Sequence, residues 1–370
     1  MDRRTLFKLA GLALSSRLAS AGQSRRPKPA ARIVLVTIGG IRRRESYSPD
    51  GLDNIPHIVN DLLPRSLFYT HVWNEGVTSH FNTISSILTG VWQHVDDWGT
   101  QPPANLTLFQ YVQEQLRSSP AETWVVTSNK AMTGNIGVGA NVILSKQLLV
   151  EAVERIIMGH STRKRLERDL LLDELTAVMQ DDYERIGWSV ASSSSILNPE
   201  LKQAFLAGLA DFIHGPDSPT SGDELTFFMA TEVLRRAAPA ILQVGFSDVE
   251  VAHSGTYSLH VGGIRRDDLL VHRLWHFLQT LPDYKDRTTM VVMPEFGRDP
   301  DGSSTNGFFN HRTDSESCRL TWMMVLGQAA RQPDVIEREV RQIDLAPSLA
   351  ALLGVTCHQA SGARLSEFAV

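Results

Sequence analysis

Residue types that bind cations or attack ester bonds recur in short polar segments, each beside an apolar run. They are Thr78, Ser79, Asn82, Asp248, His253, Glu295 and His311. Carboxylate oxygens and imidazole nitrogens are ligands for Zn²⁺, Mn²⁺ and similar cations. Because a bound cation polarises an ester oxygen and generates a nucleophile near neutral pH, the set indicates metal-assisted hydrolysis.

Two adjacent hydroxyls, Thr78 and Ser79, precede a predicted helix that closes at Gly90. The backbone N–H groups and the dipole at a helix start favour an anion, so either hydroxyl is a candidate nucleophile toward a phosphate or sulfate. Ordinary helix capping is the structural alternative. A hydroxyl needs a base or a metal to activate it, and His80 and Glu75 are the candidate bases in the same segment.

The elements that must position these residues begin with buried strands. Six apolar runs predict them: Ile33–Ile38, Leu67–Trp73, Thr123–Ser128, Ala240–Phe246, Thr289–Pro294 and Leu320–Leu326. Their nearly continuous hydrophobicity is typical of parallel strands covered on both faces. In an open sheet of such strands, ligands bind at the carboxyl ends, which is where the acidic and imidazole groups stand.

Helices are expected between these strands. Apolar spacing predicts them over Leu106–Arg117, over Asp267–Leu281 with Asp267 and Asp268 in the first turn, and over Leu345–Leu353. Gly354 is expected to end the last of these helices. The alternation predicts an α/β fold with a doubly wound, mostly parallel sheet. Residues 146–236 carry almost no strand signal and predict a helical insertion in a domain that spans residues 30–370.

The N-terminus has the pattern of an export signal. Arg3 and Arg4 precede Thr-Leu-Phe-Lys, a short apolar stretch follows, and a small-residue cleavage pattern ends at Ala21. The paired arginines favour the twin-arginine pathway, with an ordinary secretion signal or an uncleaved anchor as alternatives. Residues 1–29 are therefore interpreted as signal peptide and linker. The chain is expected to be periplasmic or secreted, with no stable membrane span after processing.

Composition and charge limit the kinds of partner that the chain is expected to bind. The chain has 370 residues and a formal net charge of −5, and no basic stripe recurs along it, which argues against nucleic acid as a partner. The expected partners are a small anionic ester as substrate and the twin-arginine export machinery. Cys318 and Cys357 form at most one disulfide, and two small buried side chains are the favoured interpretation.

The order of the segments resembles the alkaline phosphatase superfamily, which includes sulfatases and phosphodiesterases. Five segments carry the resemblance: IVLVTIGGIR, GVTSHFNTISSILTG, SDVEVAHSG, VVMPEFGR and QIDLAPSLAALLGV with Gly362 and Leu365. The last corresponds to the C-terminal helix of the superfamily and is among the more specific matches. The resemblance covers nearly all of the mature chain and implies an alkaline-phosphatase-like α/β fold.

Residue by residue, the resemblance implies one retained metal site. Asp248, His253 and His311 match its ligands, zinc is the expected metal with manganese or calcium as alternatives, and three ligands leave an open position for catalysis. Glu295 is either a fourth ligand or the ion-pair partner of Arg298. Asn82 matches asparagines that donate to an anionic oxygen in phosphodiesterase relatives.

Three positions depart from the superfamily pattern. Gly39 stands where a metal-binding Asp is usual, and Glu295 and Phe296 stand in place of Asp-His, so the second metal site loses its usual ligands. The double glycine and Glu-Phe-Gly-Arg resemble an exported bacterial branch. Two hypotheses follow: a single-metal hydrolase of phosphate or sulfate esters, or a catalytically degenerate relative that binds a ligand or a partner protein.

Overall fold

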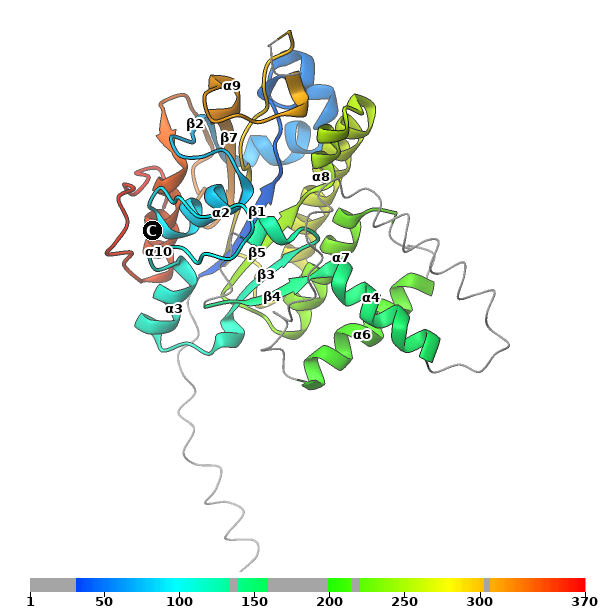
Figure 1. The fold of residues 1–370 in the computed structure, drawn as a ribbon. Helices are drawn as coiled ribbons and strands as arrows, with labels where there is room; N and C mark the ends of the chain where they lie inside the picture. Colours follow the sequence, from blue (N-terminus) through cyan, green and yellow to red (C-terminus); the bar gives the residue numbers. More distant parts are fainter. Residues whose placement is uncertain (1–30, 134–138, 159–198, 215–219, 303–306, 370) are drawn as a thin grey trace, which may run out of the picture.

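One sheet organises the protein. The structure is a computed structural model that describes residues 31–133, 139–158, 199–214, 220–302 and 307–369. Among these residues, nine strands form a sheet in the order β4-β3-β5-β1-β6-β7-β2-β8, with β9 paired to β2 (Figure 1). The strands are β1 (Arg32–Ile38), β2 (Ser66–Trp73), β3 (Thr123–Thr127), β4 (Asn141–Leu144), β5 (Ile241–Phe246), β6 (Thr288–Pro294), β7 (Leu320–Gly327), β8 (Asp334–Ile336) and β9 (Val340–Arg341).

Most strand pairs are parallel. β1 pairs in parallel with β5 and β6, β3 with β4 and β5, and β2 with β8 and β9. β7 runs antiparallel to both of its neighbours, β6 and β2. The carboxyl ends of β1, β2, β5 and β6 therefore share one edge with the start of β7. The predicted doubly wound, mostly parallel α/β fold is confirmed.

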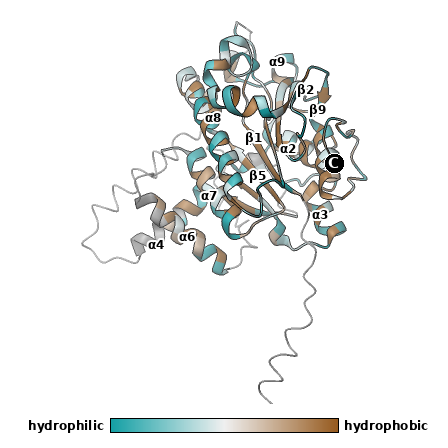
Figure 2. Ribbon diagram, turned by 180° about the vertical axis from the view of Figure 1, so that it is seen from behind, coloured by the Kyte–Doolittle hydropathy of each residue, from teal (hydrophilic) through white to brown (hydrophobic). Residues whose placement is uncertain are grey.

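Helices cover both faces of this sheet. They are α2 (His80–Thr89), α3 (Leu108–Leu116), α4 (Ser145–Met158), α6 (Pro199–His214), α7 (Gly222–Arg236), α8 (Tyr257–Thr280), α9 (Glu316–Arg319) and α10 (Leu345–Leu353). Side chains alternate across β1, so that Val34 and Val36 join a core with α7 and α8, while Ile33 and Leu35 join a core with α2, α3 and α10. Figure 2 shows hydrophobic strands in the middle and hydrophilic residues on helices such as α8.

The six strands expected from the sequence are present, with bounds within one residue. The strands that the sequence pattern missed are β4, β8 and β9, which have 4, 3 and 2 residues. Runs this short give too few positions for a periodic signal. β7 differs from the expectation in direction, because it runs antiparallel to both of its neighbours, β6 and β2.

One helix boundary was predicted wrongly. α8 begins at Tyr257, ten residues before the expected start, so Asp267 and Asp268 lie in its middle and not in its first turn. Both side chains are buried. Asp268 accepts hydrogen bonds from the backbone N–H groups of His57 and Ile58, which accounts for an acidic residue inside a helix.

The helical segment expected over residues 146–236 is described in part. α4, α6 and α7 are helical and pack on one another, and α7 also packs on β5 (Figure 1). Residues 159–198 and 215–219 of the predicted insertion, and the predicted signal peptide, lie outside the described residues. None of the described helices is long and apolar enough to cross a membrane.

Glycines end two of the helices, α2 and α10. Gly90 and Gly354 adopt left-handed conformations, with φ of 72° and 73°, at the carboxyl ends of α2 and α10. A side chain at Gly90 would also lie 2.7 Å from Cβ of Ala360. The predicted termination of the C-terminal helix at Gly354 is confirmed.

Candidate active site

Five segments meet at the carboxyl edge of the sheet. The loops after β1, β2, β5 and β6 bring Gly40, His80, Glu250 and Glu295 together, and the loop before β7 brings His311. Nδ1 of His80 lies 2.7 Å from Oε2 of Glu295, and Nε2 of the same ring lies 3.4 Å from Oε2 of Glu250. The parallel strand order thus gathers residues that are more than 200 positions apart.

A 3₁₀ turn after β5 decides which side chains enter this group. The turn spans Asp248–Ser254 and places residues three apart on the same face. Glu250 and His253 consequently point together, with 3.1 Å between Oε2 and Nε2. Asp248 points away, and its carboxylate accepts a hydrogen bond of 2.6 Å from Arg266.

His311 is held in the form that a metal ligand needs. Its Nδ1 lies 2.7 Å from the carbonyl oxygen of Thr78, and because a carbonyl only accepts, Nδ1 carries the hydrogen. Burial, reinforced by the charge of Arg298, lowers the pKa of His311 to about 3, so the ring is neutral and Nε2 keeps its lone pair. That atom lies 3.1 Å from Nε2 of His253. A backbone carbonyl that fixes the tautomer is a usual partner of a ligating histidine.

Both carboxylate oxygens of Glu250 bond to other segments of the site. Oε1 accepts from the backbone N–H of Gly40 at 2.5 Å, and Oε2 accepts from Nη2 of Arg298 at 2.5 Å. Burial alone would raise the pKa of Glu250, but the positive charges of Arg298 and His80 outweigh burial and hold the pKa well below its usual value. The carboxylate is therefore ionised. A Cβ on Gly39 would lie 2.3 Å from Oε1, so a residue with a side chain there would have to displace this carboxylate.

His80 is, besides Arg298, a second positively charged side chain in the site. The side chain is fully buried, which alone would lower its pKa, but the negative charges of Glu295 and Glu250 raise the pKa well above the usual value. His80 therefore binds both carboxylates as an imidazolium, and Glu295 makes this contact in addition to any role toward a metal. Phe296 packs against His311 with 4.3 Å between the ring centroids and closes that side of the group.

The donor set fits a divalent cation. Tetrahedral zinc with ligand bonds of 2.0–2.1 Å requires about 3.3 Å between ligand atoms. Two edges of the triangle formed by Glu250, His253 and His311 measure 3.1 Å. Ligand atoms of Glu250 and His311 lie within 4.8 Å of one another in a group that includes His80, whose imidazolium offers no lone pair to a metal. Three donors at this spacing can hold one metal ion and leave a position for substrate or water.

The two candidate hydroxyls have different environments. Thr78 is buried, and its Oγ1 donates a 2.7 Å hydrogen bond to the carbonyl oxygen of His311. Ser79 is partly exposed at the N-cap of α2, where its Oγ makes no capping bond. Instead, Ser79 Oγ donates to Asp97 at 2.7 Å and accepts from Asn82 Nδ2 at 2.8 Å. Of these two hydroxyls, that of Ser79 is both paired with a carboxylate and accessible.

Sequence reasoning did not assign three residues that the geometry brings into play: Glu250, Arg298 as the partner of Glu250, and Asp97. The spacing of Glu250 and His253 was visible, but its meaning depends on the 3₁₀ turn. Asp97 lies in the loop after α2, where it accepts from Ser79. The assignments of Asp248 and Glu295 as metal ligands stay predictions, with Asp248 bonded to Arg266 and Glu295 to His80.

Solved structures with the same fold belong to the alkaline phosphatase superfamily. A superfamily protein from Vibrio parahaemolyticus superposes with a TM-score of 0.55 at 14% identity, over 92% of this chain and 70% of that one. A phosphonate monoester hydrolase from Agrobacterium radiobacter gives 0.55 at 13% identity, over 90% and 76%. The alkaline phosphatase PafA gives 0.53 at 11% identity, over 92% and 99%. No protein-family model and no curated protein matches the sequence.

The class that these observations define is an alkaline-phosphatase-like α/β protein. The resemblance inferred from the five sequence segments is thereby confirmed at the level of the fold. Its site differs from the superfamily pattern at Gly39 and Phe296. There, Glu250 occupies the space beside residue 39, and Phe296 packs against His311 with the two rings tilted.

Proposed function

We propose that the protein is an exported, metal-dependent hydrolase of phosphate or sulfate esters with a single metal site. One observation carries the proposal: Nε2 of His253 and Nε2 of His311 lie 3.1 Å apart, and Oε2 of Glu250 lies 3.1 Å from the first of them. Two imidazoles and an ionised carboxylate at this spacing are the donor set of a catalytic zinc site. The relatives of known activity with this fold include a phosphonate monoester hydrolase and an alkaline phosphatase.

Ser79 is the proposed nucleophile. Its hydroxyl attacks the phosphorus or sulfur atom, the proton passes to Asp97 at 2.7 Å, and the ester oxygen leaves with its electron pair. A covalent seryl ester results, and water hydrolyses it in a second step. The backbone N–H groups at the start of α2 are placed to bind the anionic oxygens, and Asn82 orients Ser79. When bound, the metal ion would polarise the ester and lower the pKa of the attacking group.

The test combines metal analysis with a substrate panel. Protein purified without chelators is expected to hold about one equivalent of a divalent transition metal, and His311→Ala is expected to lose it. Phosphomonoesters, phosphodiesters and sulfate esters form the panel. Ser79→Ala should abolish turnover, whereas the control His94→Ala, which changes an exposed histidine, should keep it. Metal-free protein, or full activity in Ser79→Ala, would refute the proposal.

A second candidate function is binding without turnover. The observation that favours it is the buried Arg298, whose guanidinium contacts Glu250 and so places a permanent positive charge beside the proposed ligands. An anion that reached this charge would be bound without a metal ion. Inorganic phosphate or sulfate that binds equally well before and after chelation, together with no activity on the panel, would select this function.

The proposed export rests on residues 1–29, with Arg3 and Arg4 before a short apolar stretch. Fractionation of bacterial cells that express the full chain is expected to place the protein in the periplasm. Arg3→Lys together with Arg4→Lys should retain it in the cytoplasm if the twin-arginine machinery carries it. A periplasmic location of the double variant would point to an ordinary secretion signal.

A further inference from the structure

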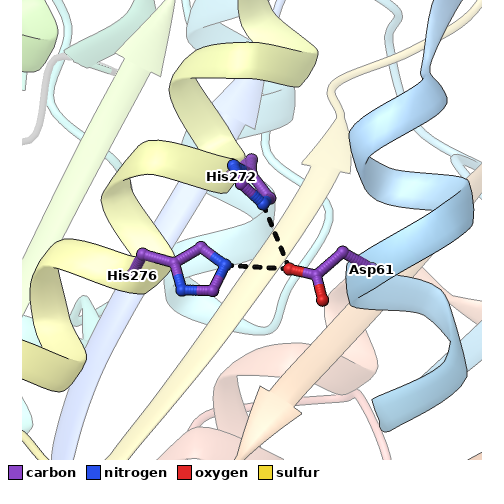
Figure 3. Close-up of side chains that lie close together, drawn as sticks. All are labelled: Asp61, His272 and His276. Atoms are coloured by element: carbon purple, nitrogen blue, oxygen red, sulfur yellow. Dashed lines mark hydrogen bonds and ion pairs between the residues drawn. The ribbon is translucent and has the colours of Figure 1, made fainter.

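A second group of metal-binding side chains lies on the surface of the protein, away from the edge of the sheet. Figure 3 shows His272 and His276 of α8 directed at Asp61, which belongs to the π-helical turn η3 (Ile58–Leu62). Nε2 of His272 lies 3.1 Å from Oδ2 of Asp61, and Nε2 of His276 lies 2.8 Å from the same oxygen. All three donor atoms lie within 4.8 Å of one another.

The spacing along α8 makes the two imidazoles neighbours. Residues four apart lie on one face of a helix, so the rings stand side by side with 4.4 Å between centroids. Val271, Leu274 and Trp275 between and beside them are buried and fix the backbone of this part of the helix. The rings therefore present their Nε2 atoms from a rigid support.

Asp61 is held just as firmly. Leu62, the next residue, is fully buried in the core. Arg65 donates to the other carboxylate oxygen, Oδ1, at 2.6 Å and also to the carbonyl oxygen of Asp61 at 2.9 Å. This arrangement turns Oδ2, the oxygen without the arginine contact, toward the two histidines.

A separate contact fixes η3 against α8. The carboxylate of Asp268 accepts from the backbone N–H of Ile58 at 2.7 Å and from the N–H and Nδ1 of His57 at 3.0 and 2.7 Å. Asp268 is buried and lies one helical turn before His272. The contacts of Asp268 therefore fix the position of η3 relative to α8 independently of Asp61, His272 and His276. A preformed ligand site requires such independent support.

We propose that Asp61, His272 and His276 form a second metal site, which binds a divalent transition metal of the zinc class. Two nitrogens and one carboxylate oxygen suit such an ion, and the spacings of 2.8 and 3.1 Å need only a small expansion toward the roughly 3.3 Å of tetrahedral zinc. The side chains keep 26%, 49% and 28% of their surface exposed for His272, His276 and Asp61, so solvent supplies the remaining ligand.

The site is independent of the proposed catalytic one. Glu250 and His253 of the catalytic site lie in the turn before α8. His272 lies 15 residues after the start of α8, about 22 Å along the helix at 1.5 Å per residue. The ion would join η3 to α8 and stabilise the fold, because a ligand that binds only the folded state opposes unfolding. The alternative is a plain ion pair between protonated histidines and Asp61, which would bind no metal.

The experiment uses the full mature chain, stripped of metal and carrying His311→Ala, so that the catalytic site is disabled. Zinc titration by calorimetry is expected to show one site in this protein and none after His272→Gln and His276→Gln are added. His94→Ala, which changes an exposed histidine elsewhere, is the matched control and should keep the site. Cobalt should give visible d–d absorption in the parent and control proteins alone.

Thermal unfolding provides a second readout. Zinc at a hundredfold excess over its dissociation constant is expected to raise the melting temperature of the His311→Ala protein by about 5 °C. The shift should disappear in the glutamine variant, which should fold because both rings are partly exposed. An equal zinc shift, or equal zinc binding, in the glutamine variant and its parent would overturn the proposal, and so would the absence of zinc binding in the parent.

Discussion

The carboxylate of Glu250 occupies the volume that a side chain on residue 39 would need. A Cβ built on Gly39 lies 2.3 Å from Oε1 of Glu250, and the same oxygen accepts from the N–H of Gly40. Gly39 and Glu250 therefore depend on each other: because Gly39 has no side chain, it leaves the space that the negatively charged carboxylate of Glu250 fills. This relationship explains why a glycine follows the first strand of the sheet at position 39.

Gly39→Ala tests that relationship. The added methyl group must displace the Glu250 carboxylate, so we expect a loss of about 1–3 kcal/mol in the free energy of unfolding. In a Glu250→Ala background the clash is absent, and the same substitution should cost much less. Urea unfolding of the four proteins in this cycle measures the coupling. Equal costs in both backgrounds would mean that Glu250 does not fill the space beside residue 39.

Arg298 is expected to be essential for stability. Its side chain is fully buried and contacts Glu250, so Arg298→Ala leaves a buried carboxylate without its main cation and should cost about 3–5 kcal/mol. The control is Arg338→Ala, which breaks the more exposed pair with Glu367 and should cost less than about 1 kcal/mol. Urea unfolding of both variants gives the comparison, and similar losses would contradict the assignment.

Asp97 is expected to act together with Ser79. If the carboxylate receives the seryl proton, Asp97→Asn should lower kcat by about 10²–10³-fold, because an amide accepts that proton poorly. In a Ser79→Ala background the same change should have almost no further effect, since residues that work as a unit are not additive. The measurement is kcat on the best ester of the panel. Additive losses would show that Asp97 acts elsewhere.

His260 is expected to make stability depend on pH. It is fully buried in α8 with Nδ1 at 2.8 Å from the carbonyl oxygen of Val249, and burial lowers its pKa from 6.5 to about 4. The unfolded chain therefore binds a proton between pH 6.5 and 4 that the folded chain does not, so stability falls as pH falls through this window. The expected loss from this residue is about 2 kcal/mol between pH 7 and pH 5.

The variant His260→Asn removes this proton and keeps a polar group of similar reach. Its stability should fall less than that of the wild-type protein between pH 7 and pH 5, as measured by urea unfolding at both values. Parallel pH curves for the two proteins would mean that folding does not change the pKa of His260.

The two cysteines are expected to be unreactive thiols. Cys318 and Cys357 are both buried and unpaired with one another, and burial raises the pKa of each thiol to about 12. A thiol reagent should therefore label neither in the native protein and both after denaturation. A reducing agent should leave the melting temperature unchanged. A fall in melting temperature on reduction would indicate a disulfide.

Local sequence was sufficient for the elements whose signal is continuous. The runs that form β1, β5 and β6 are buried on both faces, so nearly every residue is apolar and the strand can be recognised without a partner. The same holds for Gly354 at the end of α10, since the end of a helix has local chemistry. Two-residue and three-residue strands carry no such signal.

The composition of the site depended on the tertiary structure. Asp248 and Glu250 are equally plausible ligands in the sequence, and the 3₁₀ turn after β5 selects Glu250 to face His253. The direction of β7 is also decided by packing, because an antiparallel strand between β6 and β2 has the same apolar pattern as a parallel one. That direction is what brings His311 to the edge where the other loops end.

The sequence by itself determined which segments are strands and helices and which residue types could do chemistry, because hydrophobic periodicity and helix-end preferences are properties of neighbouring residues. Only the tertiary structure decided the partners. The spacing of His272 and His276 is visible in the chain, but Asp61, 211 residues earlier, joins them because η3 packs on α8. Contacts over such separations depend on the relative placement of whole elements, which no local pattern encodes.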